Sequence, residues 1–258
     1  MTKSAPVQGT QVVKRIANLM REVAQRNEQG ARLVDLCRTV QLEQPTAHRL
    51  LKALAAEGLV VQHPESKRYQ LGPLVSELGL AVQTAFDVRA LAHETLERIA
   101  SFTKDTVYLL VQSRYESVCL DRREGSYPIK VLTLDVGGRR PLGSNASGVC
   151  LLGSLPEEEM EGILQHNASL YPQYEGLSEA KVRSYVQEFK ARGYADVSIA
   201  PGTRTVGLAI KGPNGRPIAA IAVAAVEGRM QSPRNEEIVQ FVLKEIVALE
   251  RSLFSHTV

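Results

Sequence analysis

Pro45 most constrains how this chain can fold, because it separates two short amphipathic segments between Arg32 and Lys52. Proline is tolerated in the first turn of a helix, where its missing N–H loses no partner, but not in a helix interior. We therefore predict one helix that starts near Arg32 and a second that begins at Gln44 and is ended by Gly58. The apolar residues expected to form the buried faces of the two helices are Leu33, Leu36, Cys37 and Val40 in the first and Ala47, Leu50, Leu51 and Leu54 in the second.

The flanking segments extend this pair into a larger pattern. Upstream, apolar residues recur at helical spacing from Val12 to Val23, which predicts a further helix. Downstream, β-rich runs at 59–62 and 69–71 enclose the polar turn 63–68. Three helices followed by a two-stranded wing are the winged helix-turn-helix layout, which we assign to residues 11–72. Residues 1–10 have no periodicity and are expected to form a disordered arm.

The charge of this N-terminal part is unbalanced. Residues 1–72 hold 11 Lys and Arg against 6 Asp and Glu, whereas the remaining residues hold 20 against 22. A basic unit attached to a slightly acidic body is what a phosphate-binding domain would show. Such an imbalance is equally common on inert surfaces, so it supports DNA binding only together with the helix pattern.

The polar residues of the second helix have the chemistry that base recognition requires. Gln44, Thr46, His48 and Arg49 are short or planar groups near its N-terminus and could contact base edges. The cations better suited to phosphate contacts are Lys52, Lys67 and Arg68. Arg32 and Pro45 complete the candidate DNA-binding set. The alternative is an ordinary solvated helix face, and His48 could equally be a packed, hydrogen-bonded histidine.

The segment Gln-Pro-Thr-Ala-His-Arg-Leu-Leu-Lys-Ala-Leu-Ala-Ala-Glu-Gly-Leu-Val at 44–60, followed by Tyr-Gln-Leu-Gly at 69–72, resembles the IclR family of bacterial transcriptional regulators. The resemblance continues to the C-terminus and covers nearly the whole chain. It implies a regulator that binds a double-stranded DNA operator, has a small-molecule effector and assembles as a homodimer, or as a dimer of dimers.

Residues 73–90 are predicted to form a helical connector. Pro73 opens a stretch with apolar residues at helical spacing, and no flexible Gly/Ser linker interrupts it. A helical connector is stiff and can transmit a rotation. The resemblance implies that it also pairs two chains, whereas the alternative is a helix packed within one chain.

Residues 91–258 are predicted to form an α+β domain in which one antiparallel sheet packs against helices. A chain of 258 residues with 44% apolar residues is long enough for this second domain. The resemblance implies a GAF/profilin-like effector-binding domain. The predicted strands are 106–112, 117–121, 129–134, 194–199, 203–211 and 217–226, with Asn214-Gly215 as a hairpin turn between the last two. The predicted helices are 147–152, 156–166, 178–192 and 236–253.

Two loops are candidates for the effector site. The first, residues 136–148, joins a strand to a helix and is rich in small residues, so backbone N–H groups could approach an anion there. The resemblance implies that Ala146 and Ser147 supply backbone donors to a carboxylate; a plain strand-to-helix connection is the alternative. The second loop follows Gly193 and carries one acidic residue, Asp196, before the strand containing Thr205.

The chain departs from the family pattern in ways that predict the effector's size. Family members often carry several acidic residues where this chain has one, and serines where it has Ala222 and Ala224. An apolar, roomier wall favours a larger or ring-bearing organic acid over a two- or three-carbon oxoacid. The candidate effector-binding residues are Leu132, Arg140, Ala146, Ser147, Gly148, Asp196, Thr205, Ala222 and Ala224.

Other functional classes find little support. The sequence has no P-loop, HExxH or GxGxxG, and the Ser147 loop only approaches the GxSxG pattern of a hydrolase, which is the enzymatic alternative. A purely architectural DNA-binding protein would not explain the large second domain. Cys37, Cys119 and Cys150 lack the spacing of a disulfide framework or zinc site, so we expect no metal and no cofactor. No apolar run is long enough to span a membrane and no signal-peptide core is present, which predicts a cytoplasmic protein.

Overall fold

The computed structural model describes residues 11–81, 88–174, 176–198, 200–212 and 214–255. The predicted arm, residues 1–10, and the middle of the predicted connector lie outside these residues. The chain divides into two compact units, Met1–Thr84 and Ala85–Val258. No described helix has the length and apolar character needed to cross a membrane.

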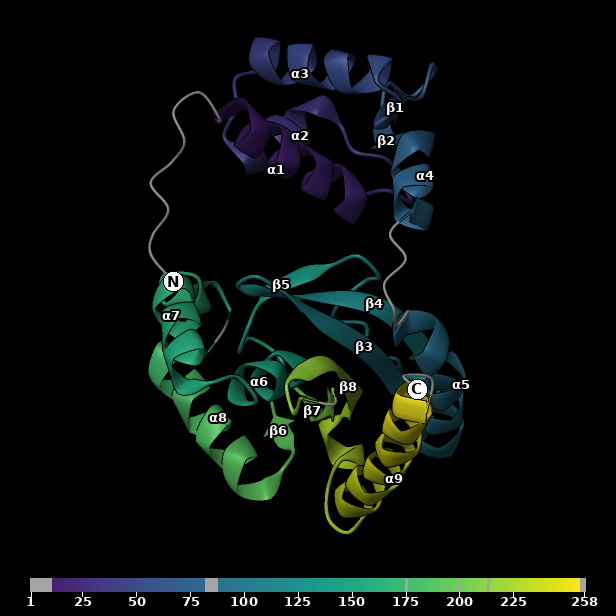
Figure 1. Cartoon of the computed structure of the whole chain (residues 1–258), viewed down its shortest axis with the longest axis vertical. Helices are drawn as coiled ribbons and strands as arrows, with labels where there is room; N and C mark the ends of the chain where they lie inside the picture. The colour runs from purple at the N-terminus through teal and green to yellow at the C-terminus, as the bar shows by residue number, and fades with distance from the viewer. Residues whose placement is uncertain (1–10, 82–87, 175, 199, 213, 256–258) are drawn as a thin grey trace. The chain divides into compact units, whose positions relative to one another are not determined.

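The first unit is a winged helix-turn-helix (Figure 1). Its small core contains the fully buried Leu19, Leu36 and Leu51, one from each of the first three helices. Four of the residues expected in this core, Leu33, Cys37, Val40 and Leu50, are only partly buried, because a unit this small keeps water near the edges of every helix. The elements are α1 (Gln11–Gln25), α2 (Leu33–Val40), α3 (Gln44–Ala56), β1 (Val60–Gln62), β2 (Tyr69–Leu71) and α4 (Pro73–Ala81).

Local chemistry sets both ends of α3. Pro45 lies in its first turn, as predicted. At its C-terminus Gly58 has a φ of 71°, and the Gly58 and Leu59 N–H groups donate to the carbonyls of Ala55 and Leu54 at 3.1 and 2.9 Å. This is the Schellman arrangement that a glycine permits, and it satisfies carbonyls that the helix end would otherwise leave unpaired.

The wing is anchored to the helices at its base. β1 and β2 pair antiparallel, with Val60 opposite Leu71, and Ala31 adds a bridge to Tyr69. Arg68 reaches back across the base and donates to the Gly30 carbonyl at 2.9 Å. Arg68 therefore links the wing to the α1–α2 loop through one N–H group, in addition to its predicted contact with a phosphate.

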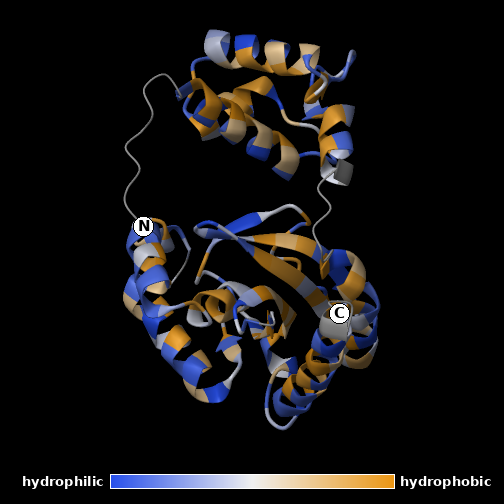
Figure 2. Ribbon diagram, in the orientation of Figure 1, coloured by the Kyte–Doolittle hydropathy of each residue, from blue (hydrophilic) through white to orange (hydrophobic). Residues whose placement is uncertain are grey.

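The second unit is built on a six-stranded antiparallel sheet in the order β5-β4-β3-β8-β7-β6. It confirms the α+β expectation, and Figure 2 shows that its strands are mainly apolar whereas the covering helices have polar outer faces. The strands are β3 (Thr106–Ser113), β4 (Glu116–Glu124), β5 (Arg139–Pro141), β6 (Ala195–Val197), β7 (Thr203–Lys211) and β8 (Pro217–Val226). The helices are α5 (Val88–Thr103), α6 (Ala146–Gly153), α7 (Glu157–Asn167), α8 (Glu179–Arg192) and α9 (Arg234–Ser255), with short 3-10 turns η1 (Tyr171–Gln173) and η2 (Glu227–Arg229).

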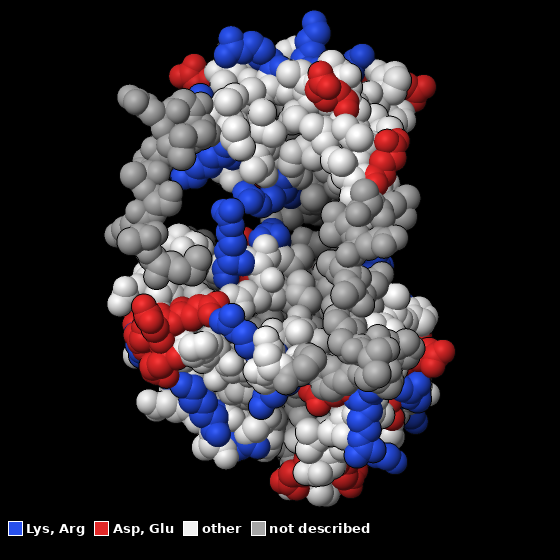
Figure 3. All heavy atoms as spheres, viewed as in Figure 1, with Lys and Arg blue, Asp and Glu red and all other residues white. Residues whose placement is uncertain are grey.

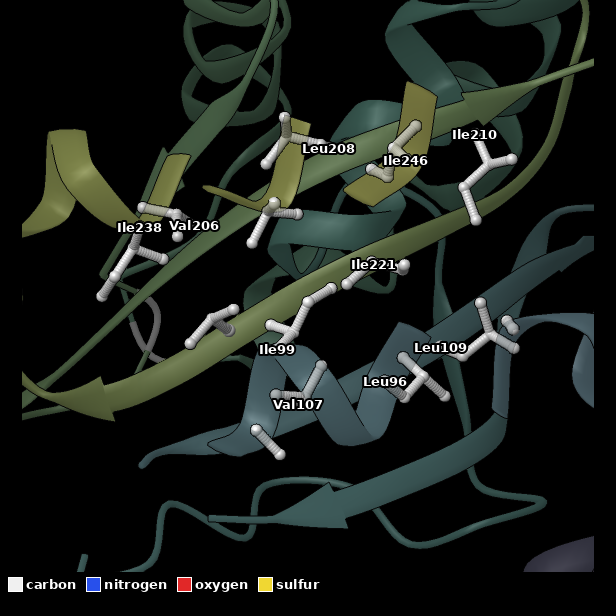
Figure 4. Packing of buried hydrophobic residues seen from close by; sticks show 14 of the residues in the cluster. Leu96, Ile99, Val107, Leu109, Val206, Leu208, Ile210, Ile221, Ile238 and Ile246 are labelled. Atoms are coloured by element: carbon white, nitrogen blue, oxygen red, sulfur yellow. The ribbon is translucent and has the colours of Figure 1, made fainter. Parts of the chain in front are cut away.

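Helices cover both faces of the sheet. On one face α5 and α9 pack against alternate residues of the central strands, and Figure 4 shows Leu96 and Ile99 of α5 beside Val107 and Ile221. On the other face α6, α7 and α8 form a second core around Leu151. The alternation of strand side chains between two buried faces explains why β8 is apolar almost throughout.

The strand predicted at 129–134 is absent, and β5 lies further along the chain at Arg139–Pro141. The phenol of Tyr108 takes the place of a neighbouring strand: it donates to the Val131 carbonyl at 2.6 Å and accepts from the Thr133 N–H at 3.1 Å. We call residues 129–136 the strap. The side chain of Tyr108 therefore hydrogen-bonds backbone N–H and C=O groups that, in the predicted β-strand, would have paired with a neighbouring strand.

The buried cysteines behave as core residues. Burial raises the pKa of the Cys119 thiol and of the Cys150 thiol to about 12. A thiol with so high a pKa carries almost no thiolate near neutral pH and is therefore a poor nucleophile.

Candidate functional site

The exposed face of α3 offers polar side chains that have no partner in the described part of the chain. Gln44, His48, Arg49 and Lys52 are all exposed, and none of their side chains makes a hydrogen bond or ion pair with another described residue. His48 is thus not the packed histidine that the sequence left open. Lys and Arg side chains gather over α3 in Figure 3. This surface presents hydrogen-bond donors and positive charge to a binding partner, as a DNA-binding face requires.

The remaining candidates for DNA contact differ in their availability. Lys67 is exposed at the tip of the wing with a φ of 56°, and Arg32 and Pro45 are also exposed. Thr46 is half-buried. Lys67 is thus fully available, whereas Arg68 has one N–H group bound to the Gly30 carbonyl and its other N–H groups left for a DNA contact.

A cavity of about 370 Å³ opens on the α6–α8 face of the six-stranded sheet. Its floor is apolar and comes from β3 and β8, and its walls come from the strap, the β5–α6 loop and the segments around η1 and β7. The lining residues are Tyr108, Leu110, Thr133, Leu134, Arg140, Ser144, Asn145, Ala146, Ser147, Gln173, Tyr174, Val197, Ala200, Pro201, Thr203, Thr205, Ala222 and Ala224.

The N-terminus of α6 supplies the donors of this cavity. Asn145 caps the helix by accepting the Gly148 N–H at 2.6 Å, while the N–H groups of Ala146 and Ser147 have no partner among the described residues. The Ser147 hydroxyl is buried and also lacks a hydrogen-bond partner there. A buried hydroxyl without a hydrogen bond lowers the stability of the fold, and a bound hydrogen-bond acceptor would remove that cost. Because the hydroxyl lies at the positive end of a helix, the best acceptor there is an anion.

Gly207 lets α6 approach the sheet closely at this point. A Cβ on Gly207 would lie 3.0 Å from the Ala146 carbonyl carbon and 3.1 Å from its Cβ. Only hydrogen in place of a side chain allows so short an approach without displacement. Gly207 thereby places the unpaired N–H groups of the helix at the cavity wall.

Arg140 is the one charged side chain in the described lining, and no described acid accompanies it there. Its Nη2 donates to the Thr133 carbonyl of the strap at 3.0 Å, and its guanidinium lies 4.9 Å from the centre of the Tyr174 ring. A half-buried cation without a carboxylate partner makes the cavity favourable for an anionic ligand.

Six of the nine predicted effector residues line the cavity and three do not. Leu132 is 51% exposed on the outside of the strap. Gly148 uses its N–H for the Asn145 cap and packs against Gly143. Asp196 accepts two hydrogen bonds from Arg204, both at 2.7 Å, and lies opposite Val206, which belongs to the core on the other face of the sheet.

Sequence reasoning missed the residues that enter the cavity from elements distant in the chain. Tyr108 and Leu110 alternate along β3, and this period of two was a usable signal for a shared face. Gln173 and Tyr174 follow α7 with no recognisable pattern. Thr133 and Leu134 were also missed, whereas Ser144, Asn145, Val197, Ala200, Pro201 and Thr203 lie in the two candidate loops without having been named as lining residues.

The geometry around Ser147 does not support the hydrolase alternative. Its hydroxyl has no hydrogen-bonded base, and no histidine is among the described lining residues. His166 instead stacks on Tyr115, with ring centroids 3.7 Å apart. Without a base within hydrogen-bond distance, a serine hydroxyl is a weak nucleophile.

Two family models together match most of the chain. Residues 80–249 match the model described as the bacterial transcriptional regulator IclR C-terminal domain, and residues 12–64 match the IclR helix-turn-helix domain. The matched ranges fall on the two units that the structure separates.

Two regulators of Escherichia coli are similar to the chain over most of their length. The chain is 26% identical over 232 residues to the HTH-type transcriptional regulator XynR of Escherichia coli, covering 88% of this chain and 92% of XynR. It is 25% identical over 248 residues to the transcriptional repressor IclR of E. coli, covering 93% and 89%. A solved IclR homologue from Microbacterium hydrocarbonoxydans, complexed with 4-hydroxybenzoate, has a similar fold, with a TM-score of 0.75, 21% identity and coverage of 95% and 99%.

Proposed function

Because the chain belongs to the IclR family of bacterial transcriptional regulators, we propose that α3 and the wing bind a specific operator and that an organic acid in the cavity controls this binding. Members of this family are regulators and not enzymes. The observation that carries the proposal is the pairing of an unpartnered polar face on α3 with a cavity that contains unpaired donors.

The α3 residues divide into two kinds of DNA contact. Gln44, His48 and Arg49 are exposed near the N-terminal half of α3 and can form directional hydrogen bonds with base edges in the major groove. Lys52 and Lys67 are flexible point charges suited to phosphates. Base contacts distinguish one sequence from another, whereas phosphate contacts add affinity to any duplex and depend strongly on salt.

Arg49→Ala should weaken specific operator binding by roughly 5- to 150-fold, the equivalent of about 1–3 kcal/mol for one lost base contact. Lys67→Ala should weaken specific and non-specific binding alike and flatten the salt dependence. Footprinting and salt titration measure both effects. Arg114→Ala, which removes an exposed cation from the other unit, is the control and should change neither. An unchanged footprint for Arg49→Ala would contradict the proposed use of α3.

The ligand that fits the cavity is a ring-bearing or similarly large organic acid. Its carboxylate would accept hydrogen bonds from the Ala146 and Ser147 N–H groups and the Ser147 hydroxyl, and its apolar part would lie against Ala222 and Ala224. The 4-hydroxybenzoate complex of the Microbacterium homologue supports this size class.

Calorimetric titration with a panel of monocyclic and open-chain acids, 4-hydroxybenzoate included, should find a ligand with a dissociation constant in the micromolar range, a free energy of roughly −8 kcal/mol. Two- and three-carbon oxoacids should bind far more weakly, because they leave most of the apolar floor uncovered. Tight binding of glyoxylate or pyruvate, with no binding of larger acids, would overturn the size assignment.

We further propose that the regulator acts as a homodimer or as a pair of dimers, with the connector between the units contributing to the dimer contact. Exposed apolar side chains at Val12 and Val13 of α1 and at Leu78 of α4 support such a contact. The ligand can change operator affinity only if it binds one arrangement of the two DNA-binding units better than another.

A further inference from the structure

The cavity extends across the sheet and is not confined to the N-terminus of α6. Arg140 stands on β5, where it pairs with Ser117, and Thr205 stands on β7, where it pairs with Ala224. The order β5-β4-β3-β8-β7 puts four strand-to-strand steps between them. The two residues therefore enter the cavity from opposite sides.

The floor between these sides is apolar. Tyr108 and Leu110 of β3 and Ala222 and Ala224 of β8 lie there, with Tyr108 directly opposite Ala222. The Tyr108 hydroxyl is already engaged with the strap as donor and as acceptor, so this residue offers its ring to a ligand. A ligand that spans the cavity must be apolar in its middle.

Each side of the cavity has its own unsatisfied donors. At the N-terminus of α6, where Ala146 lies against Gly207 of β7, these are the Ser147 hydroxyl and the first N–H groups of the helix. The cap residue Asn145 extends further and donates to the Ser117 hydroxyl of β4 at 3.2 Å. On the β5 side the Arg140 guanidinium makes one hydrogen bond, to Thr133, and its remaining N–H groups have no partner among the described residues. Every hydrogen-bonding atom of a guanidinium is a donor, so Arg140 requires an acceptor, and a carboxylate fits it best.

Arg140 is also held in position for this task. The Thr133 carbonyl fixes one edge of its guanidinium, and the Tyr174 ring supports its face. The Thr133 N–H is bound in turn by the Tyr108 hydroxyl, which ties the strap to the sheet. A guanidinium restrained by its neighbours loses less side-chain entropy on binding a ligand than a free one would.

We propose that the cavity binds a two-ended acid: one carboxylate at the N-terminus of α6, an apolar middle over Tyr108 and Ala222, and a second acceptor, best a second carboxylate, at Arg140. This rests on the proposed function and adds to it a specificity-determining residue and a narrower ligand class. A cavity of about 370 Å³ has room for one ring with substituents at both ends. With no described acid in the lining, Arg140 and the partial positive charge of the helix N-terminus each favour one carboxylate.

Benzoate and benzene-1,4-dicarboxylate form a matched pair of probes, because they differ by one carboxylate at the opposite end of the ring. Calorimetry on the full-length protein should show the diacid binding about 10- to 100-fold tighter than benzoate, as expected for a charge-assisted pair with Arg140. Arg140→Met, which keeps an unbranched apolar side chain but removes the guanidinium and its charge, should abolish this preference and leave benzoate affinity within a few-fold. Arg140→Lys should restore part of the preference.

Arg139→Met is the matched control, because the neighbouring arginine on β5 is paired with Glu116 and Ser113 and does not line the cavity. It should preserve the preference for the diacid. Equal affinities of wild-type protein for the two probes, or the same loss of both in Arg140→Met, would overturn the inference while leaving the acid-binding function intact. If neither probe binds and a different class of ligand does, the proposed function and this inference fail together.

Discussion

Asp105→Ala is expected to lower the free energy of unfolding of the second unit by about 3 kcal/mol, the low end of the cost of breaking a buried ion pair. The Asp105 carboxylate is 1% exposed. It accepts hydrogen bonds from Arg229 at 3.0 and 3.2 Å and from Arg234 at 2.6 Å. Removing it leaves two guanidiniums without their shared anion, but both retain some contact with water, which limits the loss.

The effect should reach beyond one ion pair, because Asp105 joins segments far apart in the sequence. It precedes β3, while Arg229 ends η2 and Arg234 begins α9. Both arginines also donate to the Thr103 carbonyl at the end of α5, and Arg229 lies 3.7 Å from the centre of the Tyr127 ring. The carboxylate thus fixes where α5 and α9 meet the central strand.

Urea denaturation followed by circular dichroism measures this loss. Asp135→Ala is the control: Asp135 also pairs with an arginine, Arg122, but its side chain is 85% exposed, so its removal should cost less than about 1 kcal/mol. Asp105→Asn keeps one acceptor oxygen and should fall between the two. A change below about 1 kcal/mol for Asp105→Ala would show that water replaces the carboxylate at no great cost.

The sequence correctly predicted those helices and strands that are defined by interactions between residues close together in the chain. The bounds of β7 and β8 agree with the sequence prediction, because long apolar runs on either side of Asn214-Gly215 define a hairpin without reference to the rest of the chain. The start of α3 was predicted equally well, since Pro45 and the apolar period both lie within it. In each case the interaction that decides the structure lies within a few residues in sequence.

The strap shows why other segments could not be predicted. Its composition is typical of a strand, but its hydrogen bonds go to the phenol of Tyr108, more than twenty residues earlier. The same limit applied to the cavity. Ala222 and Ala224 were found through resemblance, whereas Tyr108 became part of the site only through the β3–β8 register, a pairing of strands more than a hundred residues apart.

Asp196 illustrates a further limit, the choice between two faces of one strand. Its neighbours Ala195 and Val197 belong to the core on the cavity side, so Asp196 must point to the other side, where Arg204 holds it. The sequence placed Asp196 in the correct loop. A shift of one residue on a strand was enough to put its side chain on the wrong face.

Ser147→Arg is expected to abolish binding of benzoate, a weakening of more than about 100-fold, because the new side chain would fill the space next to the α6 N-terminus in which the carboxylate and ring would lie. Ser147 lies at the start of α6 with its side chain against the cavity, so the longer residue can occupy the space that a ligand would use. An unchanged midpoint of urea denaturation followed by circular dichroism would show that the variant folds.

Ser169→Arg provides the matched control, since it adds the same side chain at an exposed serine outside the cavity lining. Ser147→Ala separates ligand binding from packing. Its hydroxyl is buried and without a partner, so its removal should raise the free energy of unfolding by up to about 1 kcal/mol while weakening benzoate binding by roughly 3- to 10-fold. A substitution that raises the stability of the protein but weakens its binding of benzoate is expected at a residue that serves ligand binding. If Ser147→Arg binds benzoate as tightly as the wild type, the ligand lies elsewhere.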